Sequence, residues 1–330
     1  RILIGLNSHQ LVSIPALGDK SDLQQGSSSA QTNGTNFADH SGENIVKQRL
    51  HFISGLPRSG STLLSAILRQ NPSFHAGMTS PLGPVVNSCI AAMGAENEFS
   101  VFFKDEQKRD ILHGIFRGYY EHVDAQGVVF DTNRMWTSRI AALRALYPGS
   151  KMICCVRNPA WILDSVERLI RKNALDQSRM FMNPQERSTV YARAEALVNR
   201  NRMIGFAWSA LKEAYYGDDA DMMLLVEYDL LAARPAETME LIYQFLGEEP
   251  FDHDFENVEY TADEFDTQLL VKDLHTVTGR VEFKPRRTVL PPDLYQQFAN
   301  LVFWQDGRGT KANHIVITPP ADQGGAPAGS

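Results

Sequence analysis

The stretch HFISGLPRSGSTLLSAILRQ, residues 51–70, decides the fold. It begins with a short apolar run typical of a buried strand, continues through a turn rich in glycine and serine, and ends with apolar residues at helical spacing. A strand that leads through such a turn into a helix presents free backbone N–H groups to an anion, and the helix dipole adds to the attraction. The sequence therefore predicts an anion-binding loop at residues 55–62.

The loop has the frame of a phosphate-binding P-loop but departs from it at one position. Gly55 and Gly60 have the expected spacing, whereas Ser61 occupies the position that holds lysine in loops that cleave ATP or GTP. The basic residue of this loop is Arg58, within the turn itself. The pattern indicates a cradle for a phosphate-like group. The alternative is a simple turn in which Ser59 or Ser61 caps the helix.

Short apolar runs elsewhere in the chain, bounded by polar or turn residues, are typical of buried parallel strands. The predicted strands are Leu50–Leu56, Val128–Thr132, Lys151–Val156 and Met222–Glu227. The predicted helices are Ser61–Gln70, Glu106–Val123, Thr137–Leu146, Trp161–Lys172, Arg187–Tyr216, Pro235–Leu246 and Pro292–Trp304. This alternation predicts an α/β protein with a P-loop-like, three-layer fold, in which a central, mostly parallel sheet is flanked by helices.

The two ends of the chain differ in composition from the rest. Residues 18–46 and 318–330 are rich in small and polar residues and have too little apolar surface to order themselves. The expected organisation is a flexible linker over residues 1–46, one domain over 47–317, and a second flexible linker over 318–330. Linkers at both ends and a first residue other than Met suggest a domain cut from a longer chain. The alternative is an ordinary protein with two flexible tails.

The charge balance excludes several classes of function. The chain has 32 lysine and arginine residues against 39 aspartate and glutamate residues, a net charge of −7, which argues against a nucleic-acid partner. Three cysteines without metal-ligand spacing argue against a disulfide scaffold and a metal site, and they favour a reducing, cytoplasmic compartment. No apolar stretch approaches the ~18 residues of a membrane span. An anionic ligand would therefore need a local basic cluster.

Two further segments carry suitable cations. Arg157 follows the strand Lys151–Val156, at the end where open α/β sheets bind ligands, and Ser165 lies about two helical turns farther on. The basic loop, GRVEFKPRR at residues 279–287, contains Arg280, Lys284, Arg286 and Arg287. Taken alone, each cation could form a surface salt bridge, and the loop could simply be solvated. Three such features in one domain favour an anion site.

Together these motifs resemble the sulfotransferases that use 3′-phosphoadenosine 5′-phosphosulfate (PAPS). PRSGST, residues 57–62, is similar to the 5′-phosphosulfate loop of that family, in the arginine-containing version of the tyrosylprotein sulfotransferases. VRNPAWILDS, residues 156–165, is similar to the 3′-phosphate motif. VEYDLLAARPAETMELIYQFLG, residues 226–247, resembles the Tyr-Glu-Asp-Leu…Pro…Phe-Leu-Gly segment. The similarity covers about residues 50–304 and implies PAPS as the sulfuryl donor, PAP as the product and no metal.

The sequence departs from the tyrosylprotein pattern in one segment, and this departure bears on the acceptor. AGMTSPLG, residues 76–83, has no acidic residue where the tyrosylprotein enzymes carry their catalytic glutamate, which argues against a peptide-tyrosine acceptor. With its linkers, the chain looks like the sulfotransferase domains of polyketide synthases that form terminal alkenes. That resemblance implies transfer to the β-hydroxyl of an acyl chain on the phosphopantetheine arm of an acyl carrier protein. A downstream thioesterase would then release the acid with loss of CO₂ and sulfate.

Three alternatives to this function stay open. The first is a stand-alone sulfotransferase that acts on a small-molecule or lipid alcohol. The second is a nucleotide-dependent kinase, against which Ser61 argues. The third is a catalytically silent domain that binds nucleotide or docks carrier proteins.

The resemblance also implies roles for individual residues in binding the nucleotide. The 5′-phosphosulfate would be bound by Arg58 and by the backbone N–H groups of Ser59, Gly60, Ser61 and Thr62. Arg157 and Ser165 would hold the 3′-phosphate, and the cations of the basic loop would close over the nucleotide. Arginine suits these tasks because its guanidinium can bind phosphate in a bidentate geometry.

Histidine suits the role of general base, because its ordinary pKa lies near neutrality. With the histidines of the tails, the predicted helices, the first strand and an acidic loop set aside, His75 and His275 remain. His275 resembles the base position of the polyketide group and is the first candidate, with His75 second, near the substrate. Arg134 follows a strand where related enzymes place a cation near the transferring group; the alternative is a salt bridge. Arg202 is a candidate contact for the phosphopantetheine phosphate, or else part of a solvated helix face.

Overall fold

A mostly parallel sheet forms the centre of the computed structural model, which describes residues 3–4, 49–124, 127–173, 175, 178–271 and 273–316. Its strand order is β1-β9-β6-β5-β2-β4-β3, and only β1 and β9 pair antiparallel. Its strands are β1 (Leu3–Ile4), β2 (Arg49–Gly55), β3 (Phe74–Ala76), β4 (Val128–Thr132), β5 (Met152–Val156), β6 (Met223–Glu227) and β9 (Asn313–Val316). The predicted α/β fold is confirmed. The predicted linkers, residues 1–46 and 318–330, lie outside the described residues except for β1.

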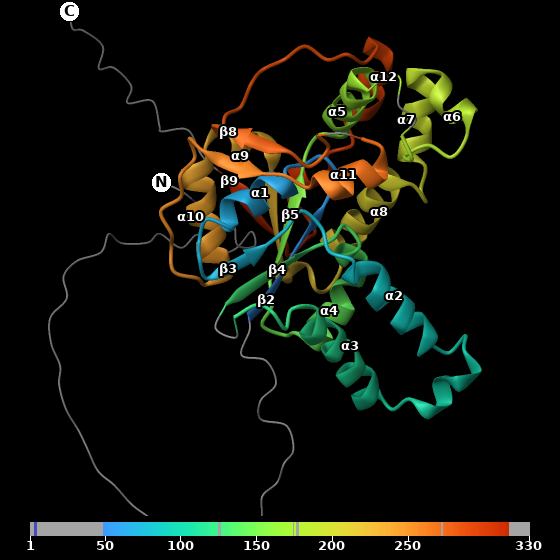
Figure 1. The fold of residues 1–330 in the computed structure, drawn as a ribbon, viewed down its shortest axis with the longest axis vertical. Coiled ribbons are helices and arrows are strands. Elements are labelled where there is room, and N and C mark those ends of the chain that lie inside the picture. The colour runs from blue at the N-terminus through green and yellow to red at the C-terminus, as the bar shows by residue number, and fades with distance from the viewer. Residues whose placement is uncertain are drawn as a thin grey trace, which may run out of the picture.

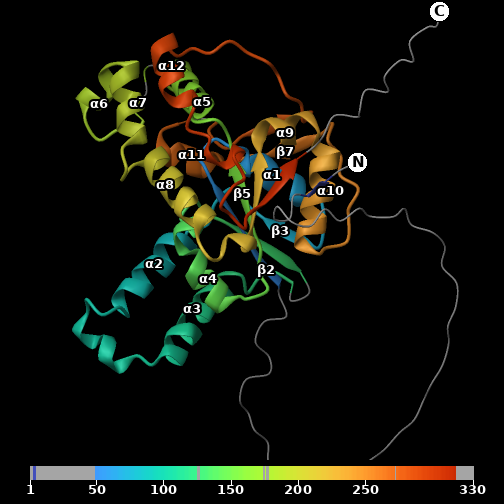
Figure 2. The same cartoon turned by 180° about the vertical axis from the view of Figure 1, so that it is seen from behind.

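Helices cover both faces of this sheet. Figure 1 shows β2, β4 and β5 in the middle of the molecule, and Figure 2 shows the same layers from behind, with α2 and α3 extending as an arm. The helices are α1 (Ser61–Leu68), α2 (Leu82–Ala92), α3 (Asp105–Tyr119), α4 (Ile140–Leu146), α5 (Pro159–Lys172), α6 (Pro184–Ser188), α7 (Val190–Val198), α8 (Met203–Tyr216), α9 (Tyr228–Ala233), α10 (Pro235–Leu246), α11 (Asp263–Leu269) and α12 (Pro292–Ala299). No helix within the described residues is long and apolar enough to span a bilayer.

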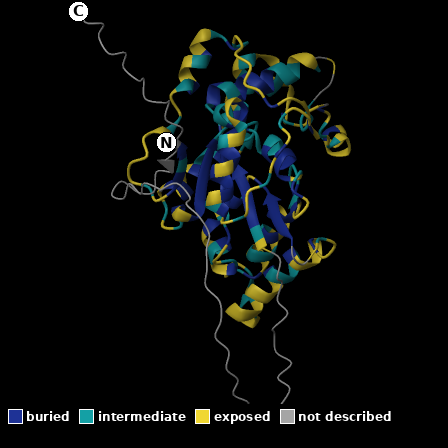
Figure 3. Cartoon of the chain, turned by 90° about the vertical axis from the view of Figure 1, so that its left-hand side faces the viewer, coloured by how far each residue is buried: buried dark blue, intermediate teal, exposed yellow. Residues whose placement is uncertain are grey.

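Two hydrophobic cores separate the three layers. Successive side chains of a strand point to opposite faces of the sheet, so Cys154 packs with residues of α3, α5 and α8, whereas Cys155 packs with residues of α1, α9 and α10. Both cysteines are fully buried, and burial raises the pKa of each thiol. Figure 3 shows the strands as a buried centre with most exposed residues outside it. The continuous apolar run of β5 is therefore explained by burial on both faces.

The helix predicted over Arg187–Tyr216 is wrong as a single element, because the chain breaks it into α6, α7 and α8. Thr189 begins α7, where its Oγ1 accepts a hydrogen bond from the N–H of Ala192 at 3.1 Å. The turn after α7 folds back so tightly on α8 that a Cβ at Gly205 would lie 2.2 Å from the carbonyl oxygen of Val198. Only a glycine allows this approach, which the apolar periodicity of the segment does not reveal.

Several short strands were not expected. β3 and β9 extend the sheet on either side, and β7 (Val258–Tyr260) pairs with β8 (Val277–Gly279) as a separate antiparallel pair. Each has three or four residues, which is too short to show an apolar period above its surroundings. The predicted helices at Glu106–Val123 and Pro292–Trp304 also end sooner than expected, at Tyr119 and Ala299.

Gly55 joins β2 to the loop, and its conformation is one that only glycine adopts without strain. Its φ is +106°, and a Cβ there would lie 2.2 Å from the carbonyl oxygen of Cys155 on β5. We expect Gly55→Ala to lower the free energy of unfolding by roughly 2–4 kcal/mol, through overpacking and backbone strain. Urea denaturation measures this, with Gly149→Ala as the control, because no atom lies within 4 Å of a Cβ at Gly149. Equal midpoints for the two variants would contradict the expectation.

Candidate functional site

Three arginines gather at the carboxyl ends of adjacent strands. Arg134 follows β4, Arg58 follows β2 and Arg157 follows β5. Strand β2 lies between β4 and β5 and is parallel to both, so the three strands end at the same edge of the sheet. This is the edge at which open α/β sheets bind ligands.

The loop between β2 and α1 leaves the start of the helix without a side-chain cap. The N-cap of α1 is Gly60, in the left-handed region at φ 93°, and no side chain of the described residues bonds to this end of the helix. Ser59 Oγ instead donates to the carbonyl oxygen of Pro57 at 3.4 Å. The simple alternative, a serine cap at Ser59 or Ser61, is therefore wrong. Backbone N–H groups at a helix start attract anions.

Arg58 is held in an unusual backbone conformation that turns its side chain inward. Its φ is +58°, in the left-handed region that non-glycine residues rarely adopt. Its Nε donates to Ser165 Oγ at 3.3 Å, and its Nη1 donates to the carbonyl oxygen of Leu274. Burial, and then repulsion from Arg157, lower the pKa of Arg58 to about 10. A strained, half-buried cation whose pKa is lowered by desolvation is typical of a site that binds an anionic ligand.

Arg157 is also poorly compensated. Its guanidinium lies 4.1 Å from the ring centre of Tyr228, and its Nε lies 3.9 Å from Oδ1 of Asp229, too far for a hydrogen bond. The Nε is buried and makes no hydrogen bond to the described chain. Burial lowers the pKa of Arg157, and the positive charge of Arg286 adds to this effect. An unpaired buried donor of this kind suits an anionic ligand.

Ser165 and Arg286 complete the cluster of cations and donors. Ser165 is buried on α5, and its hydroxyl meets Arg58. Arg286 comes from the irregular segment between β8 and α12, and its Nη2 lies 2.8 Å from Oδ2 of Asp164. The charge of Arg286 contributes to lowering the pKa of both Arg58 and Arg157. Three guanidinium groups thus repel one another at a single place.

His275 lies beside this cluster and is held by a buried carboxylate. Its Nδ1 lies 2.6 Å from Oδ1 of Asp266, and its backbone N–H donates to Oδ2 at 2.8 Å. A carboxylate oxygen accepts, so Nδ1 carries the proton and Nε2 is left as a proton acceptor. Burial lowers the pKa of His275, Asp266 opposes this, and the charges of Arg58 and Arg134 add to it. The imidazole is therefore neutral near pH 7 and oriented to receive a proton.

Arg134 is exposed to solvent by surface area, yet desolvation by the surrounding protein lowers its pKa. Its charge also lowers the pKa of His275, which places the guanidinium near the imidazole. The guanidinium of Arg134 is therefore accessible to a ligand, and its charge also affects the imidazole of His275. Among the described residues, no three His, Cys, Asp or Glu side chains form a group that could hold a metal ion.

Other predicted residues lie apart from this cluster. Arg280 pairs with Glu256 at 3.3 Å, and Lys284 pairs with Glu282 at 2.6 Å, all on the exposed surface. Arg287 is exposed as well. Of the basic loop, Arg286 contributes to lowering the pKa of both Arg58 and Arg157.

Arg202 and His75 are also engaged elsewhere. Arg202 Nη2 lies 3.1 Å from Glu186 and donates to the carbonyl oxygen of Met180 at 2.8 Å. His75 packs edge-on against Tyr120 and His122, and burial followed by the neighbouring His122 lowers its pKa. Neither residue has a contact with the three clustered guanidinium groups among the interactions of the described chain.

Two residues that contact the candidate site, Asp266 and Tyr228, were not predicted from the sequence. Asp266 lies in the acidic stretch DEFDTQL, where nothing distinguishes it from its neighbours. Tyr228 borders the loop so closely that a Cβ at Gly60 would lie 2.9 Å from its ring, which gives Gly60 a second reason to be glycine. The signals for Tyr228 are its place immediately after the predicted strand Met222–Glu227 and its position in the family-like segment 226–247.

Residues 51–253 match a family model described as the sulfotransferase family. The sulfotransferase domain of the olefin synthase from Synechococcus PCC 7002 is similar at 19% identity, covering 80% of this chain and 97% of that chain, with a TM-score of 0.44. The sulfotransferase domain from the curacin biosynthetic pathway is similar at 16% identity, covering 77% and 91%, with a TM-score of 0.44. A sulfotransferase from Alicyclobacillus acidocaldarius is similar at 13% identity, covering 79% and 95%, with a TM-score of 0.44. A search of curated proteins finds no significant match.

Proposed function

Because this chain belongs to the sulfotransferase family, we propose that it moves the sulfuryl group of PAPS to an alcohol and leaves PAP as the product. One observation carries the proposal. Arg58, Arg157 and Arg286 converge at one edge of the sheet, with the neutral imidazole of His275 beside them. A donor with two separate anionic groups suits this arrangement, because a single small anion would leave part of the cluster uncompensated.

The fit to PAPS is argued from the cations and donors of the loop and of α5. Arg58 and the backbone N–H groups of residues 59–62 would bind the 5′-phosphosulfate, and their charge would stabilise the leaving phosphate. Arg157, with its unpaired buried Nε, would hold the 3′-phosphate together with Ser165. Arg286 would cover the nucleotide. The remaining cations of the basic loop, Arg280, Lys284 and Arg287, stay a prediction from the sequence.

His275 is proposed as the general base. Its Nε2 accepts the hydroxyl proton of the alcohol while the alcohol oxygen bonds to sulfur and the bond from sulfur to the phosphate oxygen breaks. Asp266 holds Nδ1–H and stabilises the imidazolium that forms. Arg134 offsets negative charge on the transferring group. His75 remains the second candidate for contact with the substrate.

The acceptor is proposed from the sequence resemblance, as a β-hydroxyacyl chain on an acyl carrier protein. Arg202 is the proposed contact for the phosphopantetheine phosphate, and a thioesterase would consume the sulfated product with loss of CO₂ and sulfate. The alternative is a stand-alone enzyme for a small-molecule or lipid alcohol, and the silent domain is the alternative of another class. Family membership argues against the kinase. We propose cytoplasmic action, since the three cysteines suit a reducing compartment.

Transfer of labelled sulfate tests this function directly. With ³⁵S-labelled PAPS, we expect label to enter a 3-hydroxyacyl carrier protein with a kcat/KM at least roughly tenfold above that for the free 3-hydroxy acid, because contacts remote from the reacting hydroxyl raise the rate. ATP labelled in its γ-phosphate should give no transfer. Equal rates for carrier-bound and free alcohols would favour the stand-alone enzyme. Binding of PAP without transfer to either acceptor would favour the silent domain.

A further inference from the structure

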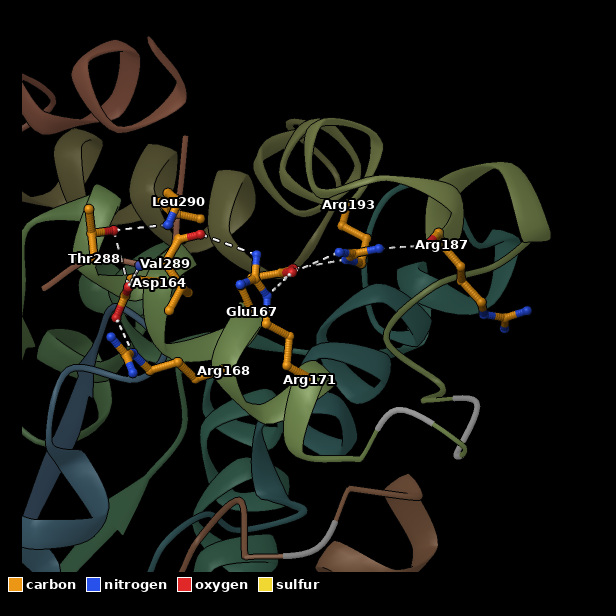
Figure 4. Close-up of polar contacts among 9 residues, drawn as sticks. All are labelled: Asp164, Glu167, Arg168, Arg171, Arg187, Arg193, Thr288, Val289 and Leu290. Atoms are coloured by element: carbon orange, nitrogen blue, oxygen red, sulfur yellow. Dashed lines mark hydrogen bonds and ion pairs between the residues drawn. The ribbon is translucent and has the colours of Figure 1, made fainter. Parts of the chain in front are cut away.

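Helix α5 buries a carboxylate that no step above uses. Asp164 is fully buried, and Figure 4 shows its side chain directed at residues 288–290, which precede α12. Its Oδ1 accepts from Thr288 Oγ1 at 3.1 Å and from the N–H of Val289 at 2.7 Å. Its Oδ2 accepts from Arg168 Nε at 3.0 Å and pairs with Arg286 Nη2 at 2.8 Å. Four donors thus converge on one carboxylate.

The segment that Asp164 contacts, residues 280–290, is held at its ends, where Val281 and Leu290 are buried and the N–H of Val281 donates to the carbonyl oxygen of Phe255 at 2.8 Å. Residues 280–290 form no helix or strand, and all of residues 282–287 are exposed. Two more side chains of α5 bind its backbone: Arg168 donates to the carbonyl oxygen of Arg287, and Arg171 donates to that of Val289 at 3.2 Å. An irregular segment depends on such contacts because its backbone groups have no regular partners. Asp164 is the buried centre of this attachment.

We propose that Asp164 is a positioning residue for nucleotide binding, which fixes Arg286 and the segment through Val289 against α5. The inference rests on the proposed function. The next residue on α5 is Ser165, proposed for the 3′-phosphate, and the charge of Asp164 acts on Arg157. One helix therefore carries a phosphate contact and the anchor of the segment that covers the nucleotide.

Two effects of removing Asp164 oppose each other. Loss of a negative charge near Arg157 would strengthen the binding of an anion, whereas release of Arg286 would weaken it. Arg168 and Arg286 already offset the charge of Asp164 at 3.0 and 2.8 Å, so the charge itself has a small effect on a ligand. Asp164 is the acidic partner of Arg286 at 2.8 Å, and the other contact of this guanidinium, at 5.7 Å from the ring centre of Trp161, is weaker. We therefore expect the release of Arg286 to outweigh the loss of charge. Weaker nucleotide binding would indicate the first effect, and tighter binding the second.

The test is Asp164→Asn in the full chain, with PAP as the binding probe and PAPS as the substrate. An asparagine amide has one acceptor oxygen, so it cannot accept hydrogen bonds from all four donors that the carboxylate of Asp164 binds. We expect the Kd for PAP and the KM for PAPS to rise roughly 10- to 100-fold, the worth of an ordered charge-assisted contact. Values of kcat at saturating PAPS and KM for the acceptor should stay within about threefold, because the reacting groups are untouched.

Glu167→Gln is the matched control. Glu167 is 4% exposed on the same helix, and its carboxylate binds Arg171 at 2.9 Å and Arg193 at 2.8 Å. Arg193 in turn donates to the carbonyl oxygen of Arg187, so this carboxylate attaches α7, and it reaches the segment of Asp164 indirectly, through the weaker bond from Arg171 to Val289 at 3.2 Å (Figure 4). We expect a loss of thermal stability similar to that of Asp164→Asn, with an unchanged Kd for PAP. A Kd raised equally in both variants would mean that Asp164 acts only through general stability, which overturns the proposal.

Thr288→Val and a double variant keep the test decisive if Asp164→Asn does not fold. Thr288→Val removes one hydrogen bond to Asp164 without a change of charge, and we expect a rise in Kd of about three- to tenfold. The same substitution in an Arg286→Ala background should add nothing further. Unchanged or tighter PAP binding by the variants overturns the inference. Failure of the wild-type chain to bind PAP or to use PAPS would instead overturn the proposed function.

Discussion

Replacing His275 by alanine is expected to lower kcat for sulfuryl transfer by about 10²- to 10⁴-fold, the usual contribution of a general base. The imidazole is neutral near pH 7 because burial lowers its pKa, and Asp266 holds its Nδ1–H so that Nε2 can accept the hydroxyl proton. The substitution removes no proposed nucleotide contact. The Kd for PAP should therefore stay within about threefold of the wild-type value, a change too small for the loss of a charge-assisted contact.

The pH dependence of the transfer rate gives a second test of His275 as the general base. A base must be neutral, so the rate should rise with pH through the lowered pKa of His275, on a limb that lies below its ordinary value of 6.5. Asp266→Asn removes the hydrogen bond and the charge that raise this pKa, so the limb should move to still lower pH. The maximal rate should fall as well, because an amide can donate to Nδ1 and favour the wrong tautomer.

His113→Ala is the control for this pair of variants. His113 lies on α3, packs its ring against Tyr147 at 4.8 Å between ring centres, and has no role in the proposed reaction. We expect its rate and its pH profile to match those of the wild type. Normal turnover by His275→Ala would eliminate this residue as the base and move attention to His75.

Replacing Arg58 by alanine should also abolish most activity, but with a different signature. We expect kcat/KM for PAPS to fall by about 10²- to 10³-fold, as on removal of a donor that stabilises developing negative charge. The variant should lose PAP affinity too, because Arg58 lies beside Ser165 and Arg157 in the proposed phosphate site. Arg58→Lys should recover only part of the loss, since a lysine keeps the charge without the planar fork of donors.

The thermal stability of Arg58→Ala distinguishes a cation that binds a ligand from one that stabilises the fold, which the loss of activity does not. Burial and the repulsion from Arg157 hold the pKa of Arg58 at about 10 instead of 12.5. A cation with a lowered pKa in the folded state destabilises the fold at every pH below that value, by about 3 kcal/mol as an upper bound. Removing it relieves this repulsion, while it also loses the bonds to Ser165 and Leu274. We therefore expect a Tm of the ligand-free protein near or above the wild-type value.

Arg144→Ala is the matched control, because it removes an arginine that is fully compensated. Arg144, on α4, pairs with Asp219 at 3.3 Å and with Asp221 at 2.6 Å, and it has no role in the proposed reaction. Its loss should lower the Tm slightly and leave kcat/KM unchanged. A drop in Tm for Arg58→Ala that is greater than that of Arg144→Ala would show that Arg58 stabilises the ligand-free fold. It would contradict the view that this cation is uncompensated until an anion binds.

The central strands and the sharp turn between β2 and α1 could be predicted because their signals are local. A short apolar run between polar residues specifies a strand buried on both faces, and a glycine-rich turn specifies the sharp entry into a helix. Arg58, Arg134 and Arg157 could be placed together in advance, because parallel strands end at a common edge of the sheet. The splitting of the helix predicted over Arg187–Tyr216 could not be foreseen, since it depends on a close backbone approach at Gly205.

The sequence by itself determined the fold class, the family resemblance and the cations at the strand ends, because each depends on neighbouring residues along the chain. Only the tertiary structure decided which residues orient them. Asp266 holds His275, and Asp164 holds Arg286, although each carboxylate lies in an unremarkable helical segment. Of the loop cations, Arg286 pairs with the buried Asp164 and acts on Arg157, whereas Arg280 pairs with the exposed Glu256. Such pairings depend on three-dimensional distance, which has no periodic signature in the sequence.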